Sequence, residues 1–314
     1  MLMTMSTRTE ISTRARGYTI GGVRMLAGLM WLANLHWKVP TDFGERNGGG
    51  LYKYVAAGAD NAPLAPYRWI LREMVLPNFQ LFGWFTLISE TVVAALLLIG
   101  YRSRLVALAG AGLAIPIGLS VLYYPKADEW AWSYLLLIGL HLLLWAVPSG
   151  DHLAVDGVLA GAPDRASRAM RTTGVVAAVI GALGLFVARS IDFAGEATAL
   201  LGSDAGFTNA DGGITRRWEL KFLFFDPLWA LVTIVLGVLL AAGSRRAALG
   251  YVAAAGFALA AVVVFIQQTF DYLRDDGVVQ RVSTGTNVAL WGGLALAAAL
   301  FARRTHVAGA PPAA

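Results

Sequence analysis

The sequence lacks cysteine and has few charged residues. None of its 314 residues is cysteine, so the chain can form no disulfide, no thiolate nucleophile and no cysteine-ligated iron–sulfur cluster. Only 14 % of the residues are charged and 57 % are hydrophobic, whereas about 25 % of the residues of an average soluble domain are charged. This composition excludes a soluble globular enzyme, a disordered chain and a nucleic-acid-binding protein. It predicts an all-α, polytopic membrane protein that contacts the lipid bilayer.

Histidine is also scarce, and its placement argues against bound metals. His36 and His141 fall at different depths of their hydrophobic segments, while His152 and His306 fall outside such segments. A membrane haem would need two histidines at matched depth. The histidines also do not combine with carboxylates at the spacing of metal ligands. We therefore expect no haem, no metal site and no iron–sulfur cluster.

What the sequence does contain is a series of long apolar segments. A helix needs about 20 apolar residues to cross the bilayer core. About eight segments approach this length, namely 17–37, 79–100, 105–124, 131–147, 173–191, 222–242, 247–268 and 283–302. With eight spans, every short basic connection falls on one side of the membrane, and the positive-inside rule assigns that side to the cytoplasm. We predict a bacterial-type plasma membrane protein with both termini in the cytoplasm.

The spans divide into two halves, possibly two parallel four-helix bundles. The expected parts are a cytoplasmic N-terminal tail (1–16), a four-helix membrane domain (17–160) with a long external loop (38–78), a cytoplasmic linker (161–172), a second four-helix membrane domain (173–304) with an external loop (192–221), and a cytoplasmic tail (305–314). The turns around Gly100 and Gly243 are alike, which indicates either a true repeat or the general appearance of tight basic turns. In the first external loop, Trp69, Ile70, Leu71 and Met74 predict one face of a short interfacial helix near 64–75.

Small residues are frequent in several of these spans. Small side chains let helices approach closely in lipid, where packing replaces the hydrophobic driving force. We expect this packing role for five glycines, namely Gly174, Gly181, Gly184, Gly250 and Gly256.

Three ionisable residues lie inside the spans of the first half. Such residues are costly in a membrane and usually face the interior of the bundle. At 1.5 Å of rise per residue, Arg24, Glu90 and His141 are expected at similar depth. One interpretation is a structural ion pair between Arg24 and Glu90, with His141 as a hydrogen-bonding neighbour. The other is a catalytic cluster in which Glu90 accepts protons beside a quinone.

Polar residues also gather at the outer end of the first span. His36, Trp37 and Lys38 precede a loop that carries Arg68 and Arg72. One interpretation is an aromatic belt at the membrane interface with a lysine anchor. The other is a substrate-binding site at which these five residues attract a small anion from outside.

The first half resembles a known family of membrane proteins. The matching features are Arg24, Trp37–Pro40, Pro77–Phe82, Glu90, the turn Leu98–Arg104 and the segment Gly150–Asp156, and together they cover about residues 17–160. In order and spacing they resemble the DoxX/DoxD integral membrane proteins, including the DoxD small subunit of thiosulfate:quinone oxidoreductase. The resemblance implies a four-helix bundle and electron transfer from thiosulfate to a membrane quinone. Because cysteine is absent, such a reaction would join two thiosulfates as tetrathionate.

Three functions therefore stay open from the sequence. The first is a membrane subunit of a quinone-linked redox system, an oxidoreductase subunit that takes electrons from thiosulfate or another small anion on the extracytoplasmic side. It implies membrane quinone and another membrane or extracytoplasmic subunit as partners. The second is a non-catalytic scaffold subunit of a respiratory complex. The third is a small-solute transporter, which the lack of Gly- or Pro-broken helices at corresponding places disfavours.

Overall fold

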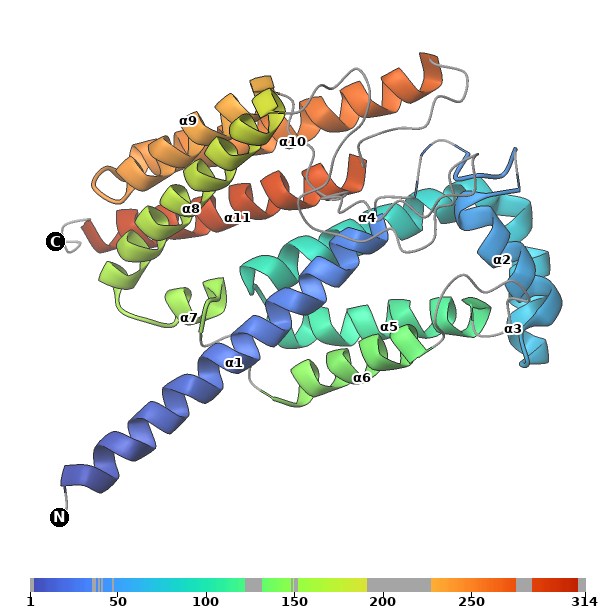
Figure 1. The fold of residues 1–314 in the computed structure, drawn as a ribbon, viewed down its shortest axis with the longest axis horizontal. Helices are drawn as coiled ribbons and strands as arrows, with labels where there is room; N and C mark the ends of the chain where they lie inside the picture. Colours follow the sequence, from blue (N-terminus) through green and yellow to red (C-terminus); the bar gives the residue numbers. More distant parts are fainter. Residues whose placement is uncertain are drawn as a thin grey trace, which may run out of the picture. The chain divides into compact units, whose positions relative to one another are not determined.

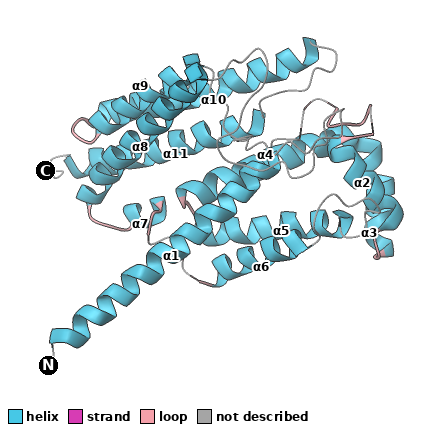
Figure 2. Ribbon diagram, viewed as in Figure 1, coloured by secondary structure: helices cyan, strands magenta, loops and turns pink. Residues whose placement is uncertain are grey.

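The computed structural model describes most of the chain as helix. It describes residues 3–35, 38, 40, 42–46, 48–121, 132–147, 149, 152–190, 227–274 and 284–309. Within these ranges every regular element is helical (Figures 1 and 2). The chain divides into two compact units, Met1–Ala162 and Pro163–Ala314. The predicted all-α, polytopic membrane fold is confirmed.

Unit 1 contains a four-helix bundle with a helical cover at one end. Its elements are α1 (Met3–Leu35), α2 (Gly50–Asn61), α3 (Ala65–Ile70), the π-helix η1 (Leu71–Val75), the 3₁₀-helix η2 (Leu76–Asn78), α4 (Phe79–Ile99), α5 (Ser103–Val121), α6 (Trp132–Ala146) and α7 (Val155–Leu159). Helix α1 packs on α4, α4 on α5, α5 on α6, and α6 on α1. Helices α2 and α3 lie across the end of this unit that is far from the start of α1 (Figure 1).

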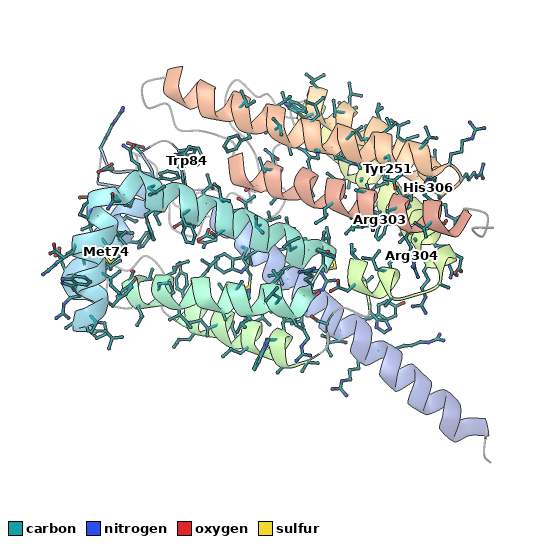
Figure 3. The ribbon with its side chains drawn as sticks, turned by 180° about the vertical axis from the view of Figure 1, so that it is seen from behind. Met74, Trp84, Tyr251, Arg303, Arg304 and His306 are labelled. Atoms are coloured by element: carbon teal, nitrogen blue, oxygen red, sulfur yellow. The ribbon has the colours of Figure 1, made fainter. Side chains whose placement is uncertain are left out.

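The helical cover occupies part of the predicted external loop 38–78. Elements α3, η1, η2 and α4 run on as one helical stretch, Ala65–Ile99, whose regular winding is interrupted before Pro77 because proline lacks the backbone N–H of a helix. A helix is present near 64–75 as predicted, and its position at the membrane interface stays a prediction. Its predicted face is wrong, since Leu71 is buried whereas Trp69, Ile70 and Met74 are exposed. Figure 3 shows Met74 at the covered end of the unit.

Unit 2 is a second four-helix bundle. It consists of α8 (Pro163–Ser190), α9 (Pro227–Gly243), α10 (Ala247–Arg274) and α11 (Thr284–Gly309). Helix α8 packs on α9, α9 on α10, α10 on α11, and α11 on α8, which is the order of neighbours found in unit 1. The expected external loop 192–221 lies outside the described residues.

Equivalent positions of the two bundles carry different residues. Glu90 lies ten residues before Gly100, and Thr233 lies ten residues before Gly243; both side chains are fully buried. A Cβ atom added at Gly100 would lie 2.6 Å from Arg24 Nη1, and one added at Gly243 would lie 2.7 Å from Met170 Sδ. Arg24 and Met170 are both fully buried as well. Unit 2 therefore keeps the packing positions of unit 1 and replaces two of its charged residues with uncharged ones.

Among the described residues, five helical stretches are long and apolar enough to cross a membrane. They are Ala65–Ile99, Ser103–Val121, Asp164–Phe186, Ala247–Ile266 and Gly285–Val307. Two shorter apolar helices, Ser133–Ala146 and Leu228–Gly243, accompany them. Together with α1, these helices overlap all eight predicted segments, but a count of eight spans stays a prediction.

The expected tails and linker are more helical than the sequence pattern indicated. Helix α1 already begins at Met3, inside the predicted tail 1–16, and α8 begins at Pro163, inside the predicted linker 161–172. A proline at the first position of a helix loses no intrahelical hydrogen bond, which accounts for the start of α8. Hydropathy locates the membrane-crossing part of a helix and not its polar extension.

Basic residues gather at one end of unit 2. They lie at the start of α8, in the turn between α9 and α10, and near the end of α11, namely Arg165, Arg168, Arg171, Arg245, Arg246, Arg303 and Arg304. Figure 3 shows Arg303, Arg304 and His306 together with Tyr251 at this end. The assignment of this end to the cytoplasm stays a prediction from the positive-inside rule.

Glycines bring α8 and α9 into backbone contact. A Cβ atom at Gly174 would lie 2.5 Å from the carbonyl oxygen of Gly237, and one at Gly181 would lie 2.8 Å from that of Ala230. Gly250 is as close to Met170, and Gly256 packs against Leu236. The predicted packing role of these four glycines is confirmed.

We expect Gly174→Ala to destabilise unit 2, because the new methyl group meets helix backbone that can move only as a whole. The cost of such overpacking is about 1–3 kcal/mol, and thermal unfolding in mild detergent would detect it as a lowered melting temperature. The matched control is Gly292→Ala, since nothing lies within 4 Å of a Cβ atom there. Equal melting temperatures for the two variants would contradict the close crossing of α8 and α9.

Candidate functional site

A buried ion pair lies inside the bundle of unit 1. Glu90 occupies the inner face of α4, and its side chain is fully buried. Lys38 follows the end of α1, and its Nζ atom lies 2.7 Å from Glu90 Oε2. The same Nζ atom donates a 2.7 Å hydrogen bond to the carbonyl oxygen of Asn34. The counter-ion of Glu90 is therefore Lys38.

This ion pair is only partly satisfied. Among the described residues, Glu90 Oε1 has no hydrogen-bond partner, although it is buried. Removing two charges from water costs several kcal/mol per ion, and a pair with unfilled hydrogen-bonding positions recovers only part of that cost. An ionisable group that is buried in a membrane bundle despite this cost is by default a candidate for a functional site.

A cavity of about 200 Å³ adjoins the ion pair. Its walls come from α2, α3, η1, α4, α5 and α6, and they are mostly apolar. The lining includes Leu51, Val55, Ile70, Leu71, Val75, Phe82, Phe85, Leu113, Ile117 and Val121, together with Lys38 and Glu90. Ile70 and Phe85 are 41 % and 60 % exposed, so the cavity opens onto an apolar surface of the bundle. A ligand that resides in lipid can reach it there.

A second polar group lies in the wall of the cavity. The hydroxyl of Tyr67, on α3, donates a 2.8 Å hydrogen bond to the carbonyl oxygen of Pro116 and lies 2.7 Å from Ser120 Oγ. All three residues line the cavity. The cavity lining therefore combines the Lys38–Glu90 ion pair with several hydroxyl groups, that of Tyr67 among them, in otherwise apolar walls.

The predicted pairing of Arg24 with Glu90 is wrong. The Arg24 guanidinium donates hydrogen bonds to the carbonyl oxygens of Leu97, Leu98 and Leu153. Leu97 lies seven residues beyond Glu90 on α4, which is about 10 Å along the helix axis. Arg24 thus neutralises the partial negative charge at the end of α4 and not the carboxylate.

Arg24 belongs to a structural junction at this end of unit 1. Helix α4 ends at Gly100, which has φ 68° and donates its N–H to Leu96; a left-handed glycine is a common helix C-cap. Asp156 accepts hydrogen bonds from the N–H groups of Arg102 and Ser103, and its own N–H bonds to Gly100. Arg24, Gly100 and Asp156 therefore join α1, α4, α5 and α7.

His141 is not placed beside Glu90 by any contact of the described residues. Its Nε2 atom accepts a 2.9 Å hydrogen bond from Trp31 Nε1, and its Nδ1 atom lies 2.8 Å from the carbonyl oxygen of Leu137. These partners define a neutral imidazole with the proton on Nδ1. His141 is also absent from the cavity lining. His141, which was expected to be a hydrogen-bonding neighbour of Glu90, instead joins α6 to α1.

The predicted anion-binding cluster is not assembled. Lys38 is buried against Glu90, Arg68 donates to the carbonyl oxygen of Ala62, and Arg72 forms an exposed ion pair with Asp60 at 3.1 Å. Neither arginine lines the cavity. His36 and Trp37, the other two members, lie outside the described residues.

Sequence reasoning missed Ser120 and did not place Tyr67 in a cavity. No motif marks them, because they come from separate helices and meet only in the folded bundle. The sequence carries one partial signal: Pro116 and Ser120 stand four residues apart and share a face of α5. Among the described residues, no group of His, Asp and Glu has the arrangement of a metal site.

The fold and this cavity define a helical, multi-pass membrane protein with a buried ion pair beside a ligand-sized site. A family model described as "TQO small subunit DoxD" matches residues 51–173. The match confirms the predicted resemblance within the first half of the chain. It includes Tyr67, Glu90 and Ser120, whereas Lys38 precedes it. Comparisons with curated proteins and with solved structures gave no match.

We expect a double-mutant cycle to identify Lys38 as the partner of Glu90. Lys38→Met leaves a buried carboxylate without a counter-ion, which costs about 3–5 kcal/mol. The double variant Lys38→Met/Glu90→Gln should recover part of this loss. The free energy of unfolding in mild detergent measures both the loss in the single variant and the recovery in the double variant.

The parallel cycle uses Arg24→Met, which introduces the residue found at the equivalent position in unit 2. Arg24→Met and Glu90→Gln should be additive within about 0.5 kcal/mol, because the two sites share no partner. Strong coupling in this second cycle, and none in the first, would overturn the assignment of Lys38.

Proposed function

We propose that the chain is the membrane subunit of a quinone-linked redox system, and that its first unit binds the quinone head group. The observation that carries this proposal is the Oε1 atom of Glu90, which has no hydrogen-bond partner among the described residues, while Lys38 holds the Oε2 atom at the wall of an apolar cavity. The family match over residues 51–173 supports the proposal.

The cavity suits a quinone ring in size and polarity. An engineered apolar cavity of about 150 Å³ holds a benzene molecule, so a cavity of about 200 Å³ has room for a ring with small substituents. The apolar walls suit the faces of the ring. The exposed rim at Ile70 and Phe85 lets a hydrocarbon tail remain in lipid.

The residues of the ion pair have distinct roles in this proposal. A bound quinone supplies an acceptor for two electrons and two protons. The Lys38 ammonium group directs positive charge at a carbonyl oxygen, where negative charge develops during reduction. Glu90, which lines the cavity, holds or releases a proton at Oε1, the oxygen that Lys38 does not contact. The surrounding apolar side chains exclude water.

Thiosulfate is the electron donor that we propose. Joining two thiosulfates as tetrathionate releases two electrons, which balances the reduction of one quinone, and it needs no cysteine. In unit 1 the cations Arg24, Lys38, Arg68 and Arg72 are engaged with carbonyl or carboxylate oxygens. We therefore place the oxidation of the anion on a partner subunit, in line with the description of the matched family as a small subunit.

We expect the purified full-length chain in mild detergent to bind a short-tailed benzoquinone, as measured by calorimetric titration. In the assembled complex, Glu90→Gln should lower thiosulfate-dependent quinone reduction by about 10²–10⁴-fold, since it removes a proton-transferring group. Quinone affinity should change far less, because glutamine keeps the shape of the side chain.

The control variant is Thr233→Val, which alters the equivalent buried position of unit 2 and should leave turnover unchanged. Absence of quinone binding by the folded wild-type chain would refute the quinone function and favour a scaffold subunit. Full turnover of Glu90→Gln would refute the proton role alone.

A further inference from the structure

We propose that Tyr67, supported by Ser120, binds the second carbonyl oxygen of the ring and makes the cavity selective for para-quinones. This inference rests on the proposed quinone function and adds a specificity residue to it. Neither residue belongs to the ion pair, and both line the same cavity.

The Lys38–Glu90 ion pair and the Tyr67–Ser120 contact lie at different heights in the bundle. Helices α4 and α5 are joined by a short turn at 100–102 and run antiparallel, so Glu90 lies near the level of Leu113 on α5. Ser120 lies seven residues further along α5, which is about 10 Å along the axis. The hydroxyl group of Tyr67 is held at the level of Ser120.

This separation matches the length of a para-quinone with a hydrogen bond at each end. Its two carbonyl oxygens point in opposite directions from one six-membered ring. With a donor about 2.8 Å from each oxygen, the ring and its two donors span roughly 10 Å. Lys38 would serve one oxygen and Tyr67 the other.

Tyr67 can turn toward a ligand without leaving an unsatisfied group behind. Its hydroxyl now donates to the carbonyl oxygen of Pro116. That oxygen is also the acceptor for the helical N–H group of Ser120, four residues later on α5. When the Tyr67 hydroxyl donates to a ligand, Ser120 Oγ can still donate to Tyr67, and the Pro116 carbonyl keeps its helical hydrogen bond.

The position of Ser120 is fixed by close packing of α2. A Cβ atom at Gly58, on α2, would lie 2.7 Å from Ser120 Oγ and 2.9 Å from Leu71 Cδ1. The glycine thus lets α2 press directly on the serine that contacts Tyr67. Tyr67 and Ser120 are held by three elements, which is the rigidity that a specificity contact needs.

The test compares two ligands on the full-length chain. The first probe is a short-tailed para-benzoquinone, and the second is a phenol with the same tail and one oxygen only. Tyr67→Phe should weaken binding of the quinone by about five- to tenfold, which is the loss of one hydrogen bond, and should leave the dissociation constant of the phenol unchanged. Tyr101→Phe, outside the cavity, is the matched control and should change neither.

The outcomes separate this inference from the proposed function. If the wild-type chain binds neither probe, the quinone function fails and Tyr67 has no ligand to select. If the wild-type chain binds quinone and Tyr67→Phe binds it equally well, or loses both probes equally, the role of Tyr67 is refuted and the quinone function stands. Should Tyr67→Phe not fold, Ser120→Ala tests the same contact, with a selective loss of quinone affinity again expected.

Discussion

The burial of the Lys38–Glu90 ion pair is the constraint on which unit 1 depends. Lys38 lies three residues beyond the end of α1, and its Nζ atom contacts Glu90 inside the bundle. A helix bundle in lipid has no need for this charge pair, since apolar side chains of similar volume pack at lower cost. The stability of the bundle therefore does not require the pair, whereas the charged wall of the cavity depends on it.

The sequence predicted the class of fold and the buried carboxylate. Apolar segments of membrane-spanning length identify helices, because a helix satisfies its own backbone hydrogen bonds in lipid. Glu90 stands out because a charged side chain is costly at that depth. The sequence did not identify Lys38 as the counter-ion of Glu90. Counting residues along two helices does not fix how the helices are offset, and Arg24, expected at the depth of Glu90, contacts the end of α4 about 10 Å away.

The cavity itself depends on features that no motif encodes. The π-helix η1 lies between α3 and α4, and Leu71 and Val75 line the cavity from it, next to Ile70 at the end of α3. A helical wheel with a period of 3.6 residues does not describe η1, in which Leu71 is buried while Met74 is exposed. π-helices are rare and often lie at functional sites.

The equivalence of the two bundles has a consequence for stoichiometry. Met170 and Thr233 fill the positions of Arg24 and Glu90 without charge, and their bundle retains the same order of helix neighbours. Had two identical bundles been encoded, each chain would carry two ion pairs. Thr233 stands where unit 1 has Glu90, and the described part of each chain therefore holds one such buried ion pair for two covalently linked bundles, so the ratio is the same at every level of expression.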